Sequence, residues 1–216
     1  MVKSIKNKLI LIILLLSVTL SLLIGIIGIT KSSQVINDEA KDKLLFMVRS
    51  YVNQFDQILN NAETINLTVG NNIKANFDLS KLQKEPKGYI ASNVQTFDKV
   101  IRGIIENQDN LLGMYICYNP DLSNEVDMIW YAHQGGHVIR KNTKNMYSIA
   151  DFNSRAEKMN WYFSAIDTGR GVWTDPYIDI NSNNLNLMTY TRPVYVGDTL
   201  IAVIGIDILF EKLKKK

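Results

Sequence analysis

The feature that most constrains this chain is an uncharged apolar run from Leu9 to Ile29. At about 1.5 Å of rise per residue, a helix of this length spans roughly 30 Å, the thickness of a bilayer core. Backbone groups in lipid must satisfy one another, so the run is predicted to be a helix. A cleaved signal peptide would have a shorter apolar region with small residues at a cleavage site, and Gly-Ile-Thr-Lys-Ser-Ser matches such a site poorly. An uncleaved transmembrane helix over residues 9–29 is therefore favoured.

Charges on the two flanks of this run predict its orientation. Lys3, Lys6 and Lys8 precede it, whereas the other flank has only Lys31 before the acids at positions 38 and 39. Because basic flanks stay in the cytoplasm, residues 1–8 are predicted to be cytoplasmic and residues 30–216 extracytoplasmic. The chain is thus expected in the cell membrane, with a single membrane pass.

The remainder of the chain carries no net charge. The first thirty residues hold three of the 24 Lys and Arg and none of the 21 Asp and Glu, so residues 31–216 contain 21 of each. This balance argues against a nucleic-acid partner, which would require a basic face. Cys117 is the single cysteine, which excludes an internal disulfide and a Cys-based zinc site.

Sequence signatures of cofactor or metal chemistry are missing. The sequence has no G-x-S-x-G, no P-loop and no H-E-x-x-H, and no cofactor is predicted. His133 and His137 flank a Gly-Gly turn and could face one another across a hairpin. Two imidazoles alone make a poor metal site, so a polar hairpin tip is favoured and no metal is predicted.

Helical spacing of apolar residues resumes after the membrane segment. Apolar residues three and four apart predict one long helix over residues 32–69, continuous with the membrane helix. Its stripe suits either a packing face or the seam of a homodimer. A polar connection with a short helical piece is expected over residues 71–88. Further helices are predicted over 94–107 and over 151–164, with Asp151 as the N-cap.

Strand patterns dominate the second half of the chain. Strands are predicted over residues 111–118, 126–133 and 137–141, with the last two joined as a hairpin across Gly135 and Gly136. Another strand begins at residues 171–173, and a second hairpin joins 185–196 to 199–207 through Gly197 and Asp198. The fold class is predicted as α+β: an antiparallel sheet with helices on one face and the last strand near its centre.

Four ordered blocks carry a family resemblance: Trp161–Ala165, Gly171–Asp179, Thr191–Tyr195 and Ile201–Ile208. With the membrane helix and the strand order, they resemble the double-Cache extracellular sensor domains of bacterial chemoreceptors, sensor histidine kinases and membrane diguanylate cyclases. The resemblance covers about residues 8–212. It implies a PAS-like sheet whose concave face holds a small ligand, here in a membrane-distal module over residues 71–212 followed by a basic tail, 213–216.

The resemblance also sets expectations for the whole receptor. In full family members a second module, a second membrane helix and a cytoplasmic output domain follow. This sequence stops where the linker to the second module would begin, so either a truncated product or an anchored one-module binder is expected. The implied function is ligand sensing in transmembrane signal transduction, and an enzyme is not expected.

Amino-acid-binding members of this family suggest which residues touch ligand. They place an Arg two residues before a Trp-Tyr pair for the ligand carboxylate, and a Tyr-x-Asp and a later strand Asp for the ammonium group. The matching residues here are Trp161, Tyr162, Tyr177, Asp179 and Asp207. The Arg position holds Met159, which cannot form the two parallel hydrogen bonds of a guanidinium, and Lys158 and Arg155 lie at other helical angles.

The resemblance therefore implies an intact ammonium site beside a broken carboxylate site. Two carboxylates among aromatic rings suit a cation, so a small amine or quaternary ammonium ligand is predicted first and an amino acid second. Weaker candidates are Tyr115, Tyr131 and Arg140, on strands expected to face the same cavity. In the alternative, Trp161 and Trp173 are core residues of a structural or remnant domain without ligand. A membrane-anchored hydrolase would need a nucleophile that the sequence does not show.

Overall fold

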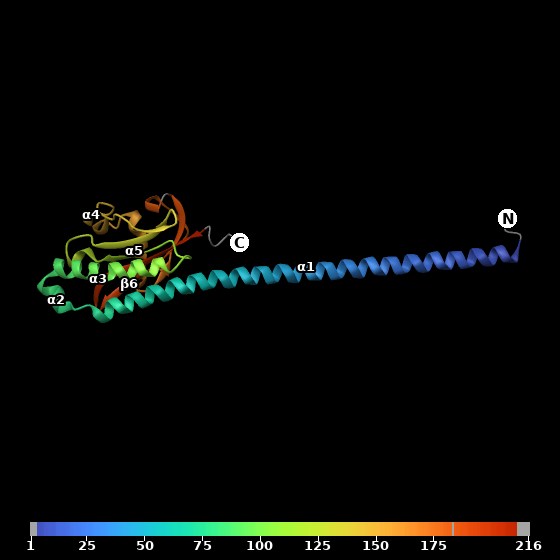
Figure 1. The fold of residues 1–216 in the computed structure, drawn as a ribbon, viewed down its shortest axis with the longest axis horizontal. Helices are drawn as coiled ribbons and strands as arrows, with labels where there is room; N and C mark the ends of the chain where they lie inside the picture. Colours follow the sequence, from blue (N-terminus) through green and yellow to red (C-terminus); the bar gives the residue numbers. More distant parts are fainter. Residues whose placement is uncertain (1–3, 183, 211–216) are drawn as a thin grey trace. The chain divides into compact units, whose positions relative to one another are not determined.

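The structure, a computed structural model, describes residues 4–182 and 184–210. Its first element is the 72-residue helix α1, Ile5–Asn76 (Figure 1). The chain divides into two compact units, residues 1–54 and 55–216, and α1 contributes to both. Lys3 and the predicted basic tail lie outside the described residues.

The first part of α1 satisfies its polar groups within the helix. The Ser17 and Thr19 hydroxyls each donate a 2.9 Å hydrogen bond to a carbonyl oxygen one turn earlier, those of Leu14 and Leu16. The large aliphatic side chains from Leu9 to Ile29 are exposed. By length and composition, α1 can cross a membrane.

Helix α1 runs without interruption past residue 69, where its end was predicted. Gly70 lies inside the helix and faces the sheet, where a Cβ would make ordinary contact with the Val194 side chain at 3.4 Å. One turn earlier, the buried Asn66 amide donates a 3.0 Å hydrogen bond to the carbonyl oxygen of Ile204. The helix therefore continues through Gly70 and ends at Asn76, where its buried face still contacts the sheet.

Two helices follow: the short helical piece that was expected within residues 71–88, and the helix predicted over residues 94–107, which begins earlier than predicted. Helix α2, Leu79–Lys84, begins at Asp78, whose carboxylate accepts the backbone N–H groups of Ser80 and Lys81. Helix α3, Pro86–Glu106, starts at Pro86 rather than at Val94. Proline suits the first turn because its fixed φ is helical and its missing N–H has no partner there.

The single helix predicted over residues 151–164 is wrong. The structure has α4, Ile149–Asn153, a 3₁₀ turn at Glu157–Met159 and α5, Asn160–Thr168. Ser148 is the N-cap of α4, and Asp151 is its third residue and completes a capping box. Arg155, with φ of 51°, interrupts the helical path between the two helices.

Within the part of the chain that the structure describes, seven antiparallel strands form one sheet. They are β1, Gly113–Tyr118; β2, Met128–Gln134; β3, His137–Arg140; β4, Val172–Trp173; β5, Tyr177–Asp179; β6, Leu185–Val196; and β7, Thr199–Leu209. The order is β3-β2-β1-β7-β6-β4, and β5 also pairs with β6. Both predicted hairpins and the central position of the last strand are confirmed, whereas β5 was not predicted as a strand.

Helices cover both faces of this sheet, which corrects the expectation of one covered face. On one face, the end of α1 and helix α3 pack on residues such as Ile116 and Ile204. On the other, Trp161 and Tyr162 of α5 and Phe152 of α4 pack near Tyr115 and Val203. Figure 1 shows α3 and α4 on opposite sides of the strands. Alternate residues of β1 and β7 therefore enter two different clusters.

Candidate ligand-binding site

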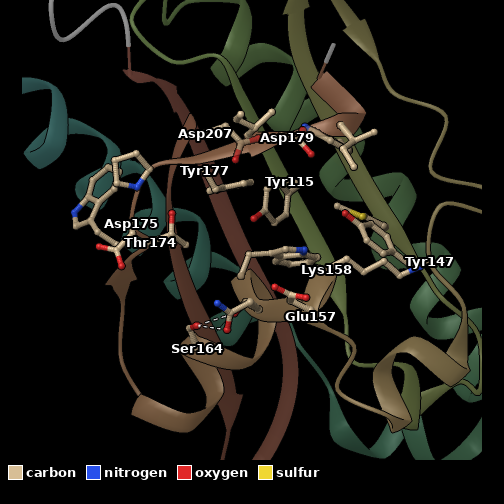
Figure 2. A pocket seen from close by; sticks show the side chains of 18 residues that line it. Tyr115, Tyr147, Glu157, Lys158, Ser164, Thr174, Asp175, Tyr177, Asp179 and Asp207 are labelled. Carbon is tan, nitrogen blue, oxygen red and sulfur yellow. Dashed lines mark hydrogen bonds between the residues drawn. The ribbon is translucent and has the colours of Figure 1, made fainter. Parts of the chain in front are cut away.

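A cavity of about 670 Å³ lies on the α5 side of the sheet. Its floor comes from β1, β2 and β7, and its walls come from α5, the 3₁₀ turn before it and residues 173–180. The lining residues are Tyr115, Met128, Trp130, Tyr147, Glu157, Lys158, Asn160, Trp161, Ser164, Trp173, Thr174, Asp175, Pro176, Tyr177, Ile178, Asp179, Ile180 and Asp207 (Figure 2).

Asp207 is the buried acid of this cavity. Its side chain lies on central strand β7, and the residue is 2% exposed. Oδ1 accepts a 2.8 Å hydrogen bond from the Thr189 hydroxyl on β6. Thr189 has a single hydroxyl proton, so the Tyr177 hydroxyl, 2.7 Å from the Thr189 oxygen, must be the donor in that contact. The three side chains form a directed chain from Tyr177 to Asp207.

Burial governs the protonation of this group. Loss of water contact raises the pKa of Asp207 to about 7, and the negative charge of Asp179 adds to the increase. The hydrogen bond from Thr189 and the positive charge of Lys141 lower the pKa but do not offset burial. A cation placed beside Asp207 would favour the carboxylate, so the site gains charge complementarity when a positive ligand enters.

Aromatic rings form the wall beside the acids. The Tyr115 and Trp161 rings meet edge to face with centroids 4.8 Å apart, and Tyr147 lies 5.9 Å from Trp161. Trp130 lies 6.0 Å from Tyr115. Burial raises the pKa of Tyr115, of Tyr147 and of Tyr177, so these phenols stay neutral. Ring faces attract cations by about 0.5–2 kcal/mol.

Glycine makes room for this wall. The Tyr115 ring lies across Gly205 of β7 so closely that a Cβ at position 205 would overlap it. The Tyr115 ring, which lines the cavity, therefore occupies the position that a side chain at residue 205 would take.

Lys158 is the basic residue of the cavity lining described above. Its Nζ lies 2.9 Å from Asp151 Oδ2 and 5.9 Å from the centre of the Tyr147 ring. Met159, at the position of the family's Arg, is completely buried and does not line the cavity. Arg155 also lies outside the lining, because its guanidinium pairs with Asp167 and stacks over Phe163.

Five of the predicted site residues line the cavity: Tyr115, Trp161, Tyr177, Asp179 and Asp207. Whether they contact a ligand stays a prediction. Tyr162 does not line the cavity, because its ring packs against Phe152 with centroids 5.0 Å apart. Trp173 does, and its indole N–H also donates a 2.7 Å hydrogen bond to Glu63 on α1.

Tyr131 and Arg140 lie on the opposite face, which corrects the expectation that they face the cavity. The Tyr131 hydroxyl donates a 2.8 Å hydrogen bond to Asp98 of α3, and Arg140 Nε donates one of 2.6 Å to the same carboxylate. Side chains alternate along a strand, so Trp130 points to the cavity when Tyr131 points away. Sequence reasoning missed Trp130, Tyr147 and Thr189.

The two histidines are not paired across their hairpin. The register sets His133 opposite Val138 and His137 opposite Gln134. His133 Nε2 lies 3.1 Å from the carbonyl oxygen of Ile105, away from the cavity lining. Among the residues that the structure describes, no group of three or more His, Cys, Asp or Glu side chains is placed to hold a metal ion.

Residues 97–215 match the family model for the first PDC sensor domain of methyl-accepting chemotaxis protein-like receptors. The match covers more than half of the chain. The chain belongs to this family of PDC sensor domains. The family is of the Cache type, so the resemblance found in the four sequence blocks is confirmed. No curated protein matches this sensor domain by sequence.

Solved sensor domains share the fold. The extracellular domain assigned to the histidine kinase soHK1S-Z6 is 17% identical with a TM-score of 0.60, and the alignment covers 76% of this chain and 57% of that one. The ligand-binding domain of the Campylobacter jejuni chemoreceptor Tlp3 in complex with L-valine is 19% identical with a TM-score of 0.52, covering 76% and 56%. The sensor domain thus spans a little over half the length of these structures.

Proposed function

We propose that this chain is the extracytoplasmic ligand-sensing region of a membrane receptor and that its cavity binds a small solute with an ammonium group. The observation that carries the proposal is the Asp207 carboxyl group, which lies at the floor of the cavity although the residue is only 2% exposed. A buried carboxylate is costly unless a cation compensates it. Asp179 and Asp175 line the same cavity and add negative charge.

The ring wall supports this choice of ligand. Tyr115, Tyr147 and Trp161 surround the space beside the acids, where their faces attract a cation and their edges pack against its carbon atoms. Trp161 and Trp173 lie at the wall and leave the cavity open, which favours a binding role over a structural or remnant domain. A hydrolase is disfavoured because His133 lies away from the cavity.

Amines and amino acids remain the two ligand classes. Tlp3 structures hold L-valine and isoleucine, at 19% and 20% identity to this chain. This supports an amino acid as one class to test. A small amine or quaternary ammonium solute fits the acidic, ring-lined wall equally well.

Membrane anchoring forms part of the proposal. The exposed aliphatic surface from Leu9 to Ile29 matches a bilayer core in length, and Lys6 and Lys8 before it support a cytoplasmic N-terminus. Beyond it, Leu44, Val48 and Tyr51 are exposed apolar residues at helical spacings. We propose that they form the seam of a homodimer.

Thermal unfolding of the full chain in lipid nanodiscs tests the function. The panel holds primary amines, quaternary ammonium compounds, amino acids and uncharged compounds of similar size. We expect a raised Tm with at least one cationic or zwitterionic member and none with the uncharged analogues. Equal shifts with charged and uncharged members, or no shift with any, would overturn the proposal.

A further inference from the structure

Trp173 connects the wall of the cavity to helix α1. Its indole N–H donates a 2.7 Å hydrogen bond to Glu63 Oε1, across 110 positions of the sequence. Trp173 ends the edge strand β4, packs against the hydrophobic cluster on the α1 side of the sheet and also lines the cavity on the α5 side. Its ring meets that of Tyr190 with centroids 5.1 Å apart. One residue thus contributes to both faces of the sheet.

Glu63 has Trp173 as its side-chain partner. In the part of the chain that the structure describes, no Lys, Arg or His forms an ion pair with Glu63. The contact is partly buried, and a hydrogen bond to a carboxylate is stronger than one between neutral groups. This bond is therefore a specific contact between α1 and the segment 173–180, all of which lines the cavity.

A continuous series of hydrogen bonds leads from Trp173 to the buried acid. Thr174, the next residue along the wall, donates its backbone N–H to the Thr189 carbonyl oxygen at 2.9 Å. The Thr174 hydroxyl accepts the Thr189 backbone N–H at 3.0 Å, and the Thr189 hydroxyl donates to Asp207. Figure 2 shows Thr174 and Asp207 beside the same cavity. The positions of Trp173 and Asp207 are therefore linked through direct contacts.

We propose that Glu63 is a positioning residue for the ligand site: its hydrogen bond to Trp173 holds the cavity wall against α1 and couples this helix to the Asp207 site. The coupling to ligand rests on the proposed function. A ligand held between the wall and Asp207 orders residues 173–180, so the bond to Glu63 costs less conformational freedom when it forms. Ligand binding and the contact with α1 therefore favour each other, and by linkage they do so to the same extent.

Hydrogen exchange of the full chain in nanodiscs, measured by mass spectrometry without ligand, tests the positioning of the wall. Glu63→Ala should speed the exchange of residues 172–180 about fivefold, whereas Glu63→Gln keeps an acceptor and should restore most of the protection. The matched control is Asn61→Ala, which removes a 2.8 Å hydrogen bond from α1 to Gln108, outside the cavity lining, and should leave this exchange unchanged. In a Trp173→Phe background, Glu63→Ala should add nothing. No effect of Glu63→Ala, or the same effect in that background, would overturn the inference.

Titration calorimetry tests the coupling to ligand, with ethylamine, tetramethylammonium, L-valine and any other panel member that raises the Tm. Each probe that binds the wild type should bind Glu63→Ala about fivefold more weakly. It should also slow the exchange of residues 59–66 in the wild type but not in Trp173→Phe. Unchanged affinity in Glu63→Ala, or equal protection of α1 in both proteins, would overturn the coupling. If the wild type binds no probe while the ligand-free exchange follows the expectation, the proposed function fails and the positioning of the wall stands.

Discussion

Tyr177 and Asp207 are joined through a single hydroxyl group. Thr189 donates to Asp207 at 2.8 Å while its oxygen lies 2.7 Å from the Tyr177 hydroxyl. The two residues lie on different strands, β5 and β7, and both line the cavity. This chain of hydroxyl groups fixes the orientation of the buried acid before any ligand arrives, which reduces the ordering that binding requires.

Replacing Thr189 with Val should remove the protein donor to Asp207 without changing side-chain volume much. The hydrogen bond from Thr189 stabilises the carboxylate form of Asp207. Without this bond, the pKa of Asp207 should rise further above about 7. Carbon-detected NMR of the Asp207 carboxyl group during a pH titration measures this shift. Thr189→Ser keeps the hydroxyl and serves as the control. An unchanged pKa in the Val variant would show that the hydrogen bond does not set the charge.

Stability should fall as pH rises through the neutral range. The native pKa of Asp207, about 7, is raised above the unfolded value of about 3.9, so the native state binds more protons between these values. Its stabilising contribution is therefore present in full below about pH 4 and is lost as pH rises through 7. The loss is about 4 kcal/mol, from roughly three pKa units at 1.36 kcal/mol each.

Asp207→Asn isolates this effect from other titrating groups. The variant should gain Tm relative to the wild type at pH 8.5, where the wild-type carboxylate is buried with its charge, and much less at pH 5. Thermal unfolding without ligand at the two pH values measures the difference. A Tm difference that does not change with pH would contradict the raised pKa.

Affinity for an ammonium ligand should follow the opposite trend. Below about pH 7 the ligand must displace the proton on Asp207. The affinity should therefore fall by up to tenfold for each unit by which the pH is lowered below 7, and should be constant above pH 8. Calorimetry at pH 6 in buffers of different ionisation enthalpy should show that binding releases a proton. Proton uptake, or a pH-independent affinity between pH 5.5 and 8, would disagree with this account.

Gly205→Ala tests the close approach of Tyr115 to the sheet. The new methyl group would overlap the ring, so the variant should lose about 1–3 kcal/mol of stability and weaken binding as the ring shifts. The matched control is Gly103→Ala on α3, where an added Cβ meets nothing within 4 Å. Helix propensity predicts that the control is stabilised by somewhat less than 1 kcal/mol. Equal effects of both substitutions on Tm would contradict the packing described here.

Much of the fold follows from local sequence patterns. Gly197 and Asp198 between two apolar strands predicted the β6–β7 hairpin, and the apolar character of residues 200–208 predicted a central strand. The short strand β5 and the break near Arg155 were not predictable in the same way. The strand β5 forms only by pairing with the start of β6, and the break coincides with the positive φ of Arg155, which a non-glycine residue rarely adopts.

Thr189 shows why the site was only partly predictable. Counting pairs back from Val196 opposite Thr199 would place Met188 opposite Asp207. A register shift between Val194 and Tyr195 instead sets Thr189 opposite Asp207. A bulge moves every later side chain by one residue, and the sequence gives no clear signal for it. The alternation of side chains along β2 likewise determines that Trp130 faces the cavity and Tyr131 faces the opposite side of the sheet.

Calorimetry of the wild type and Asp207→Asn at pH 8, in nanodiscs and with the strongest ligand of the panel, tests the central claim most directly. The carboxylate beside the ligand cation should contribute a charge-assisted hydrogen bond, so the amide variant should bind at least tenfold more weakly while remaining folded. Equal affinity in the two proteins would contradict the claim that Asp207 recognises the ammonium group.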